Sequence, residues 1–205
     1  MTDDPRDIVE SGYDAIAGRY AAAIRAGRGP ETYFRSFLAR VLERIPEGGT
    51  VLDLGCGAGL VTADLTRHAR VVAVDRSAGQ IELASRNAPD AMLVRADMTE
   101  VAFAPGSFDA VVAFWTLIHV PRVAHASLLE RIHAWLKPAG PFAGTLGSGD
   151  NPADLVPDFY GAPMYWSHFD AETNRTMLRE AGFDVLEADE IEDEGETPLW
   201  VIATA

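Results

Sequence analysis

The chain has 205 residues, which suits a single domain, and 48% of them are hydrophobic, enough to bury a full core. Its formal net charge of −14, without any cluster of basic residues, argues against nucleic acid or a membrane surface as a partner. The single cysteine excludes an internal disulfide, and the acidic amino terminus lacks the features of a signal peptide, so we expect a cytoplasmic protein.

Two amphipathic helices are predicted at the start of the chain. Apolar residues share one helical face from Tyr13 to Ile24 and again from Phe34 to Ile45. Gly29-Pro30 separates the two runs, and Pro46 with Gly48-Gly49 ends the second. We therefore expect a helical cap over the first 47 residues.

Beyond residue 50, strands and helices alternate, which predicts a mostly parallel sheet with helices on both faces. Ser77, with Gln80 three positions later, predicts a capping box at the start of one helix. Asp170 is the expected cap of another helix, which ends before Gly182. The expected strands are residues 50–54, 70–75, 91–96, 108–114, 141–146, 183–191 and 199–204, and the helices among them are residues 60–68 and 77–87, one that follows residue 121, and residues 170–181.

The strongest motif is the run Val51-Leu52-Asp53-Leu54-Gly55-Cys56-Gly57-Ala58-Gly59, an apolar strand that leads directly into a glycine-rich turn and a helix. Glycines at such a turn let the backbone bend sharply and let a ligand approach main-chain N–H groups. The Gly-x-Gly-x-Gly spacing differs from the Gly-x-Gly-x-x-Gly fingerprint of dinucleotide-binding proteins.

Two acids follow the next two strands. Asp75 comes 20 positions after Gly55, at the end of an apolar strand, where a carboxylate can accept both hydroxyls of a ribose. Asp97 follows the third strand and could reach an adenine amino group. Either acid alone could be a solvated strand end or a helix cap, but together with the glycine turn they indicate a nucleoside-binding site.

These residues resemble the succession of motifs in the class I S-adenosylmethionine-dependent methyltransferases, in the group called methyltransferase type 11 or 25. The likeness covers about residues 13–147. One departure is Gly140-Pro141, where the family commonly has two glycines, at a strand start to which we assign no chemistry. The matching segments are Asp53–Gly59, Asp75, Asp97-Met98, Phe108–Val112 and Leu136–Gly140.

The resemblance implies S-adenosylmethionine as cofactor and transfer of its methyl group to a small-molecule acceptor, whose accepting atom stays open among O, N, S and C. It also implies an α/β, Rossmann-like, seven-stranded sheet in the order 3-2-1-4-5-7-6, with strand 7 antiparallel. One domain then spans residues 1–205. Its parts are the helical cap at 1–47, the cofactor-binding core at 48–147, a lid over the acceptor at 148–169, and a helix with two strands at 170–205.

The same likeness implies which residues contact the cofactor. Gly55 and Gly57 would pass close to its methionine moiety, Asp75 would hold the ribose, and Asp97-Met98 would frame the adenine. Tyr13 and Tyr20 resemble the aromatic pair of the family's N-terminal Tyr-Asp-x-x-Ala-x-x-Tyr segment, although such residues can also simply face the core. The full expected set is Tyr13, Tyr20, Asp53, Gly55, Gly57, Gly59, Asp75, Arg76, Asp97, Met98, Phe114 and Trp115.

His119, after the fourth strand, is the candidate catalytic residue. A neutral imidazole there could accept a proton near physiological pH, and the alternative is a histidine that packs against a helix and hydrogen-bonds the backbone. His125 and His133 are expected on the surface or on a helix face. Because the spacing of the three histidines does not place them on one helical face, and methyl transfer from a sulfonium demands no metal, we expect no metal site.

Residues 147–169 interrupt the alternation of strands and helices. The segment holds three prolines and five aromatic residues without clear periodicity, so we expect a long loop, and such loops are often functional. It is the expected acceptor lid, since Tyr160, Tyr165, Trp166 and His168 combine apolar surface with polar groups that suit a largely apolar acceptor. The alternative is a loop that only braces the sheet edge.

Two other classes of function remain possible. A non-catalytic partner or regulatory subunit would keep the S-adenosylmethionine-binding fold without turnover. A nicotinamide-dependent oxidoreductase is disfavoured by the glycine spacing and by the lack of a Tyr-x-x-x-Lys pair, because the only lysine, Lys137, has His133 four positions before it. The sequence does not indicate an oligomeric state.

Overall fold

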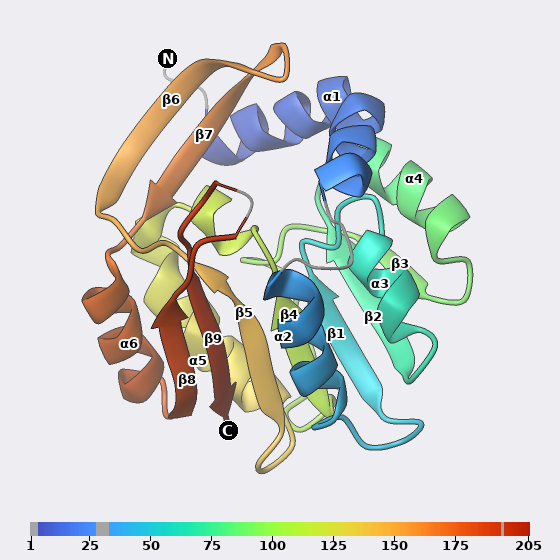
Figure 1. Ribbon diagram of the computed structural model, residues 1–205, viewed down its shortest axis with the longest axis vertical. Coiled ribbons are helices and arrows are strands. Elements are labelled where there is room, and N and C mark those ends of the chain that lie inside the picture. Colours follow the sequence, from blue (N-terminus) through green and yellow to red (C-terminus); the bar gives the residue numbers. More distant parts are fainter. Residues whose placement is uncertain (1–3, 28–32, 194) are drawn as a thin grey trace.

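The computed structural model describes residues 4–27, 33–193 and 195–205. Within these ranges seven strands form one sheet in the order β3-β2-β1-β4-β5-β9-β8 (Figure 1). Strands β3, β2, β1, β4 and β5 are mutually parallel, and β9 runs antiparallel to both β5 and β8. The expected order 3-2-1-4-5-7-6 is thus confirmed, with β8 and β9 as its last two strands in the chain. The strands are β1 Thr50–Leu54, β2 Arg70–Asp75, β3 Met92–Arg95, β4 Ala110–Ala113, β5 Pro141–Leu146, β8 Asp184–Glu190 and β9 Leu199–Thr204.

Helices bury both faces of this sheet. Along β1, Leu52 and Leu54 belong to one hydrophobic cluster with α5 and α6, whereas Val51 belongs to a second cluster with α2, α3 and α4. Because side chains alternate along a strand, this division means that both faces of the sheet are apolar, as is typical of parallel sheets. The helices are α1 Pro5–Gly27, α2 Tyr33–Leu42, α3 Leu60–Leu65, α4 Ala78–Asn87, α5 His125–Trp135 and α6 Ala171–Glu180, with short 3-10 turns η1 Leu117–His119 and η2 Arg122–Ala124.

The helix starts follow the expected capping chemistry with one difference. The Ser77 hydroxyl accepts the Gln80 N–H at 3.1 Å, but Gln80 does not return the bond, because the Ser77 N–H donates to Asp75 at 2.9 Å. Only half of the expected capping box therefore forms. Asp170 accepts the Thr173 N–H at 2.8 Å and caps α6 as predicted. Helix α3 is shorter than expected, since the chain turns after residue 65.

The segment 147–169 is a β-hairpin and not a loop, which corrects the expectation. Strands β6 (Asn151–Phe159) and β7 (Ala162–His168) form a separate antiparallel pair. Tyr160 and Gly161 join them with φ of 53° and 90°, the positive values of a type I′ turn, which matches the twist of paired strands. The period-two pattern was obscured because the pairing shifts register at two places along the hairpin.

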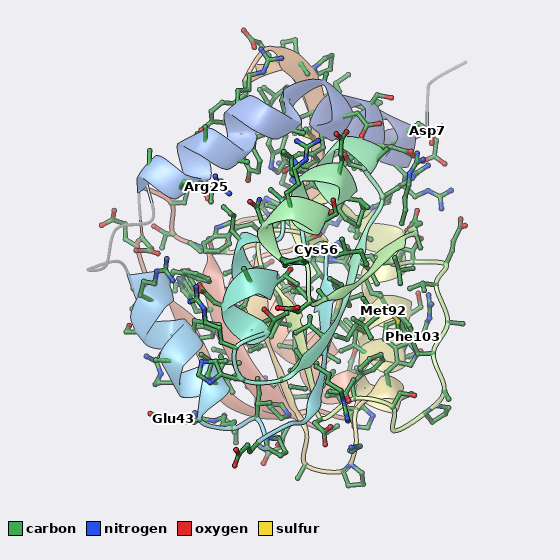
Figure 2. All side chains as sticks on the ribbon, turned by 90° about the vertical axis from the view of Figure 1, so that its right-hand side faces the viewer. Asp7, Arg25, Glu43, Cys56, Met92 and Phe103 are labelled. Carbon is green, nitrogen blue, oxygen red and sulfur yellow. The ribbon has the colours of Figure 1, made fainter. Side chains whose placement is uncertain are left out.

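Helix α1 lies across the carboxyl ends of the strands. It packs against β7 and α4 (Figure 1). Its Ile16 forms a third hydrophobic cluster with Ala162 and Met164 of the hairpin. Figure 2 shows α1 crossing above the sheet from near Asp7 to near Arg25. The expected break at Gly29-Pro30 lies outside the described residues. Helix α1 and the hairpin thus cover the carboxyl ends of the strands.

No helix in the described ranges has the length and apolarity to span a membrane.

Candidate functional site

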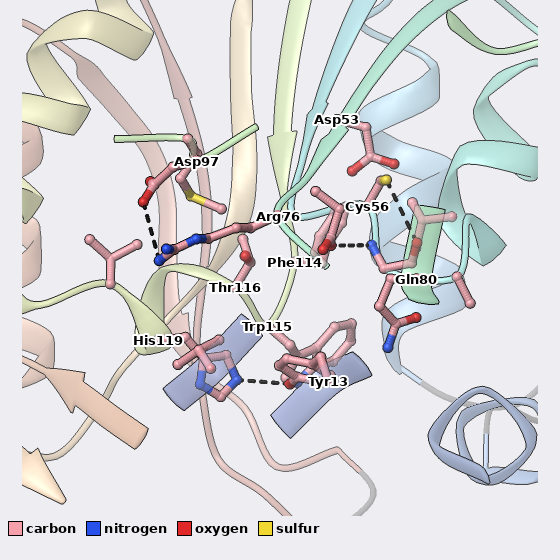
Figure 3. A pocket seen from close by; sticks show the side chains of 18 of the residues that line it. Tyr13, Asp53, Cys56, Arg76, Gln80, Asp97, Phe114, Trp115, Thr116 and His119 are labelled. Carbon is pink, nitrogen blue, oxygen red and sulfur yellow. Dashed lines mark hydrogen bonds and ion pairs between the residues drawn. The ribbon is translucent and has the colours of Figure 1, made fainter. Parts of the chain in front are cut away.

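A pocket lies beneath α1 at the carboxyl ends of β1, β2 and β4 (Figure 3). Open parallel sheets bind their ligands at this edge. Gly59 is the only one of the twelve expected cofactor contacts that is not at its wall. The lining includes Tyr13, Tyr20, Asp53, Gly55, Gly57, Asp75, Arg76, Asp97, Met98, Phe114, Trp115 and the candidate base His119.

Asp75 ends β2 and presents a carboxylate to the pocket. Its two oxygens accept the N–H groups of Gly57 and Ser77, at 2.8 and 2.9 Å, which fixes the carboxylate against the glycine turn. Each oxygen keeps a further lone pair for a ligand hydroxyl. Burial raises the pKa of Asp75 to about 6, although these hydrogen bonds act in the opposite direction.

Asp53 supports the glycine turn from inside. Its carboxylate is 2% exposed and accepts the Thr62 hydroxyl at 2.6 Å, so the end of β1 is tied to the first turn of α3. Thr62 had no signal in the sequence. Asp53 thereby holds the glycine turn in place at the pocket wall.

Asp97 and Arg76 form the other end of the pocket and connect the sheet to α1. One oxygen of Asp97 accepts the N–H and hydroxyl of Thr99, and the other lies 3.7 Å from Arg76. The Arg76 guanidinium pairs with Asp7 and Glu10 of α1, at 2.5 and 2.8 Å. These ion pairs hold the start of α1 against the ends of β2 and β3.

Trp115 follows β4 in a strained backbone conformation. Its φ is 52°, in the left-handed region that a bulky residue rarely adopts, and its N–H donates to the Thr145 hydroxyl at 2.6 Å. The Trp115 ring packs against Phe34 and Trp200, and it forms part of the pocket wall with Phe114. The bend at this position also places Thr116 beside the glycine turn.

His119 is held between α1 and the hairpin. Its Nδ1 lies 2.7 Å from the Tyr165 carbonyl oxygen, and its Nε2 lies 2.9 Å from the Tyr13 hydroxyl (Figure 3). Because a carbonyl only accepts, the neutral ring carries its proton on Nδ1, and Nε2 accepts the Tyr13 O–H. Burial lowers the pKa of His119 to about 4 and raises that of Tyr13. Both groups are therefore uncharged at neutral pH.

The expected lid residues lie behind this pair, not at the pocket wall. The Trp166 ring is 5.3 Å from the His119 ring, and the exposed Tyr160 ring is 5.6 Å from that of Tyr20. Tyr165 is buried, and its carbonyl is the partner of His119. His168 is close to the Gly149 carbonyl, at 2.8 Å, on the far side of the hairpin.

His125, His133 and Cys56 are structural. His125 lies on helix α5, one of the two expected positions, and is buried there with Nε2 2.9 Å from the Val120 carbonyl oxygen. His133 packs edge-on against Phe183. Burial raises the pKa of the Cys56 thiol, so it stays protonated at the pocket wall. The part of the chain that the structure describes holds no group of three or more histidine, cysteine or acidic residues suited to a metal ion.

Arg6 and Gln80 are among the pocket residues that were not recognised from the sequence. Arg6 of α1 lines the pocket and lies 3.6 Å from Asp97, but an arginine near the amino terminus carries no motif. Gln80 also lines it, although its spacing from Ser77 had assigned it to a capping box. The spacing of Ser77 and Gln80 does not reveal that the Ser77 N–H donates to Asp75 instead of Gln80.

Comparison with known proteins shows what part of the chain resembles. Residues 51–140 match the family described as Methyltransferase domain. The chain is 36% identical over 132 residues to a demethylmenaquinone methyltransferase of Beutenbergia cavernae, covering 63% of this chain and 54% of that one. It is 40% identical over 113 residues to a ubiquinone biosynthesis O-methyltransferase of Methylocella silvestris, covering 52% and 43%. The chain thus spans about half the length of these relatives, or less.

The fold comparison agrees. A Burkholderia thailandensis 1,6-didemethyltoxoflavin-N1-methyltransferase, solved with its namesake ligand and S-adenosylhomocysteine, superposes with a TM-score of 0.74 at 22% identity. The superposition covers 100% of this chain and 91% of that one. The glycine turn, Asp75 and Asp97 all lie within the matched residues 51–140, at the edge of the sheet where the pocket opens. The family match, the methyltransferase relatives and the fold together support a class I S-adenosylmethionine-dependent methyltransferase.

Proposed function

We propose that this protein binds S-adenosylmethionine and transfers its methyl group to a small-molecule acceptor. The observation that carries the proposal is the pocket that places the glycine turn, Asp75 and Asp97 around one space, with Tyr13 and His119 on the same wall. Two of the relatives are named for demethylmenaquinone and ubiquinone, which are small molecules, and this supports the same class of acceptor here. Among the described residues, the pocket lining holds two cations, Arg6 and Arg76, and both are paired with acids.

A melting experiment separates this function from the alternatives. S-adenosylhomocysteine should raise the melting temperature of the protein and NAD should not, because a ligand that binds only the folded state stabilises it. Transfer of labelled methyl from S-adenosylmethionine to candidate metabolites then separates an enzyme from a non-catalytic subunit. Stabilisation by NAD alone would overturn the proposal.

The pocket fits the cofactor chemically. Asp75 offers acceptors for the hydroxyls of a ribose, and Asp97 with Met98 lies at the wall where the adenine would be framed. The Gly55 to Gly57 turn brings the backbone to the edge of the space, as the methionine moiety requires. When bound, the cofactor supplies a methyl group on a sulfonium whose sulfur leaves as a neutral thioether.

Tyr13 and His119 would then remove the proton of the acceptor. As the acceptor lone pair forms its bond to the methyl carbon, the acceptor proton would pass to the Tyr13 oxygen and the Tyr13 proton to Nε2 of His119. The resulting imidazolium keeps its Nδ1–H bond to the Tyr165 carbonyl. An acceptor that is already deprotonated would use the pair only for orientation.

The first prediction concerns Asp75 and pH. Asp75→Asn is expected to weaken S-adenosylhomocysteine binding at pH 8 by about 1.5–3 kcal/mol, the scale of hydrogen bonds to a charged group. Since burial raises the pKa of Asp75 to about 6, the wild type should lose affinity as the pH falls through 6 and approach the variant near pH 5. Calorimetry from pH 5 to 8 checks this, with the exposed Asp90→Asn as control.

The same shift has the opposite sign for stability. The folded pKa of Asp75 lies above its usual 3.8, so its contribution to the free energy of unfolding is fully present below pH 3.8 and is lost as the pH rises through 6. Asp75→Asn should remove this pH dependence from the ligand-free protein. Equal affinities of wild type and variant at pH 8 would eliminate Asp75 as the ribose ligand.

The second prediction concerns the hairpin as the cover of the acceptor. Trp166→Ala is expected to impair acceptor kinetics by about 1–3 kcal/mol, with S-adenosylhomocysteine binding nearly intact, because the Trp166 ring packs behind His119. Steady-state kinetics with an acceptor identified by the labelled-methyl screen provide the measurement. Leu155→Ala, an exposed change on the same hairpin, should have no effect. Loss of cofactor affinity instead would make the hairpin a structural brace.

A further inference from the structure

The side chain of Gln80 is a polar group that the proposed chemistry leaves without a role. It is 1% exposed, and within the described residues neither Oε1 nor Nε2 has a hydrogen-bond partner. Buried carboxamides are normally bonded, as Asn174 is to the carbonyls of Gly147 and Phe169. An unpaired buried amide costs stability, so its presence at a pocket wall calls for a cause.

The position of the amide relates it to Asp75. Gln80 lies in the first turn of α4 and lines the pocket (Figure 3). Its Oε1 would lie 3.9 Å from a Cβ placed on Gly57, and the N–H of that same Gly57 donates to Asp75 at 2.8 Å. The carboxylate and the amide therefore converge on one residue of the glycine turn.

Local capping does not account for the side chain. In a capping box Gln80 would accept the Ser77 N–H, but Asp75 accepts it instead. Asp75 is thus fixed by two backbone N–H groups while Gln80 is left free for another partner. The terminal torsion of glutamine is soft, so a small rotation can aim either amide atom at a ligand.

We propose that Gln80 is a cofactor-binding residue whose amide binds a ribose hydroxyl next to Asp75. This rests on the proposed function. A carboxylate can only accept, so a hydroxyl that donates to Asp75 keeps its lone pairs free, and the Gln80 Nε2 can donate to one of them. The Asp75 carboxylate accepts and the Gln80 Nε2 donates, so the two side chains complement the neighbouring hydroxyls of a ribose, which can do both. The ligand thereby satisfies an amide that the ligand-free protein leaves unpaired.

Gln80→Met tests this with two readouts of opposite sign. The substitution keeps the length of the side chain and removes the unpaired amide, so the ligand-free protein should melt at a higher temperature. Its affinity for S-adenosylhomocysteine should fall on the order of tenfold, the effect of one lost hydrogen bond. The matched control is Asn174→Leu, which removes a paired amide far from the pocket: it should lower the melting temperature and leave the affinity unchanged.

Ligand analogues locate the contact. Affinities of the wild type and Gln80→Met are compared for 2′-deoxy and 3′-deoxy S-adenosylhomocysteine. The two proteins should bind equally the analogue that lacks the hydroxyl contacted by Gln80. A penalty that persists with both, and vanishes with the decarboxylated analogue, would move Gln80 to the amino-acid end and overturn the ribose assignment. Wild-type affinity in Gln80→Met would overturn the contact itself. If the wild type does not bind S-adenosylhomocysteine, the proposed function fails instead.

Discussion

His119→Ala is expected to lower methyl transfer by roughly 10²–10⁴-fold while affinity for S-adenosylhomocysteine stays near that of the wild type. His119 contacts the Tyr13 hydroxyl and the Tyr165 carbonyl, and neither bond is needed to hold a nucleoside. The loss should therefore appear in the rate of transfer and not in cofactor binding. Single-turnover rates beside calorimetric affinities provide the measurement.

The partner variant tests whether the two residues act as a unit. Tyr13→Phe removes the hydroxyl between the acceptor and His119 and should cost a similar factor. The double variant should be little slower than either single one, because residues in one proton path are not additive. Additive losses would separate their roles, and a loss below tenfold in His119→Ala would reduce it to a positioning residue.

The pH dependence distinguishes His119 from Asp75. Burial lowers the pKa of His119 to about 4, so its neutral form persists well below pH 6. At saturating cofactor the transfer rate should therefore not fall between pH 7 and 5 because of His119. Cofactor affinity should fall over that interval, since Asp75 becomes protonated near pH 6. A rate that falls with a midpoint near 6.5 would indicate a histidine that the ligand has made accessible.

What the sequence foretold was local in the chain. Each expected cofactor contact on the sheet lies at or near the carboxyl end of a strand, and parallel strands bring such positions to one edge. The place of Asp75 beside the glycine turn followed from this rule and from the family likeness, and the strand order followed from the likeness alone. These features could be predicted because each depends on a short run of consecutive residues, whose pattern is visible in one sequence.

What it missed depends on contacts between distant segments. Tyr13 and His119 lie 106 positions apart, and no spacing rule predicts that their side chains share a hydrogen bond. The hairpin was hidden by its register shifts, so its aromatic residues were expected at the pocket wall and instead lie behind His119. Gln80 was assigned to a local cap, because its competitor Asp75 comes from the preceding strand and not from the helix.

Gly55→Ala is the second change with a large expected effect, because it disturbs the fold and the site together. A Cβ on Gly55 would lie 1.9 Å from the Thr116 hydroxyl oxygen and 2.4 Å from the Thr116 Cβ, so a side-chain rotation cannot relieve the clash. The φ of Gly55 is 67°, which costs an alanine roughly 1–2 kcal/mol more. With overpacking of about 1–3 kcal/mol, the free energy of unfolding should fall by roughly 2–5 kcal/mol.

Cofactor binding should fall with it, since the clash moves either the glycine turn or the end of β4, and both line the pocket. Denaturant unfolding and S-adenosylhomocysteine calorimetry measure the two effects. Gly149→Ala is the matched control, because nothing lies within 4 Å of the added Cβ, and its stability should stay within about 0.5 kcal/mol. Adding Thr116→Gly to Gly55→Ala should recover the steric part of the loss and leave the backbone part. A Gly55→Ala protein with wild-type stability and affinity would show that the turn tolerates a side chain, and the close approach at Gly55 would then not be what shapes the site.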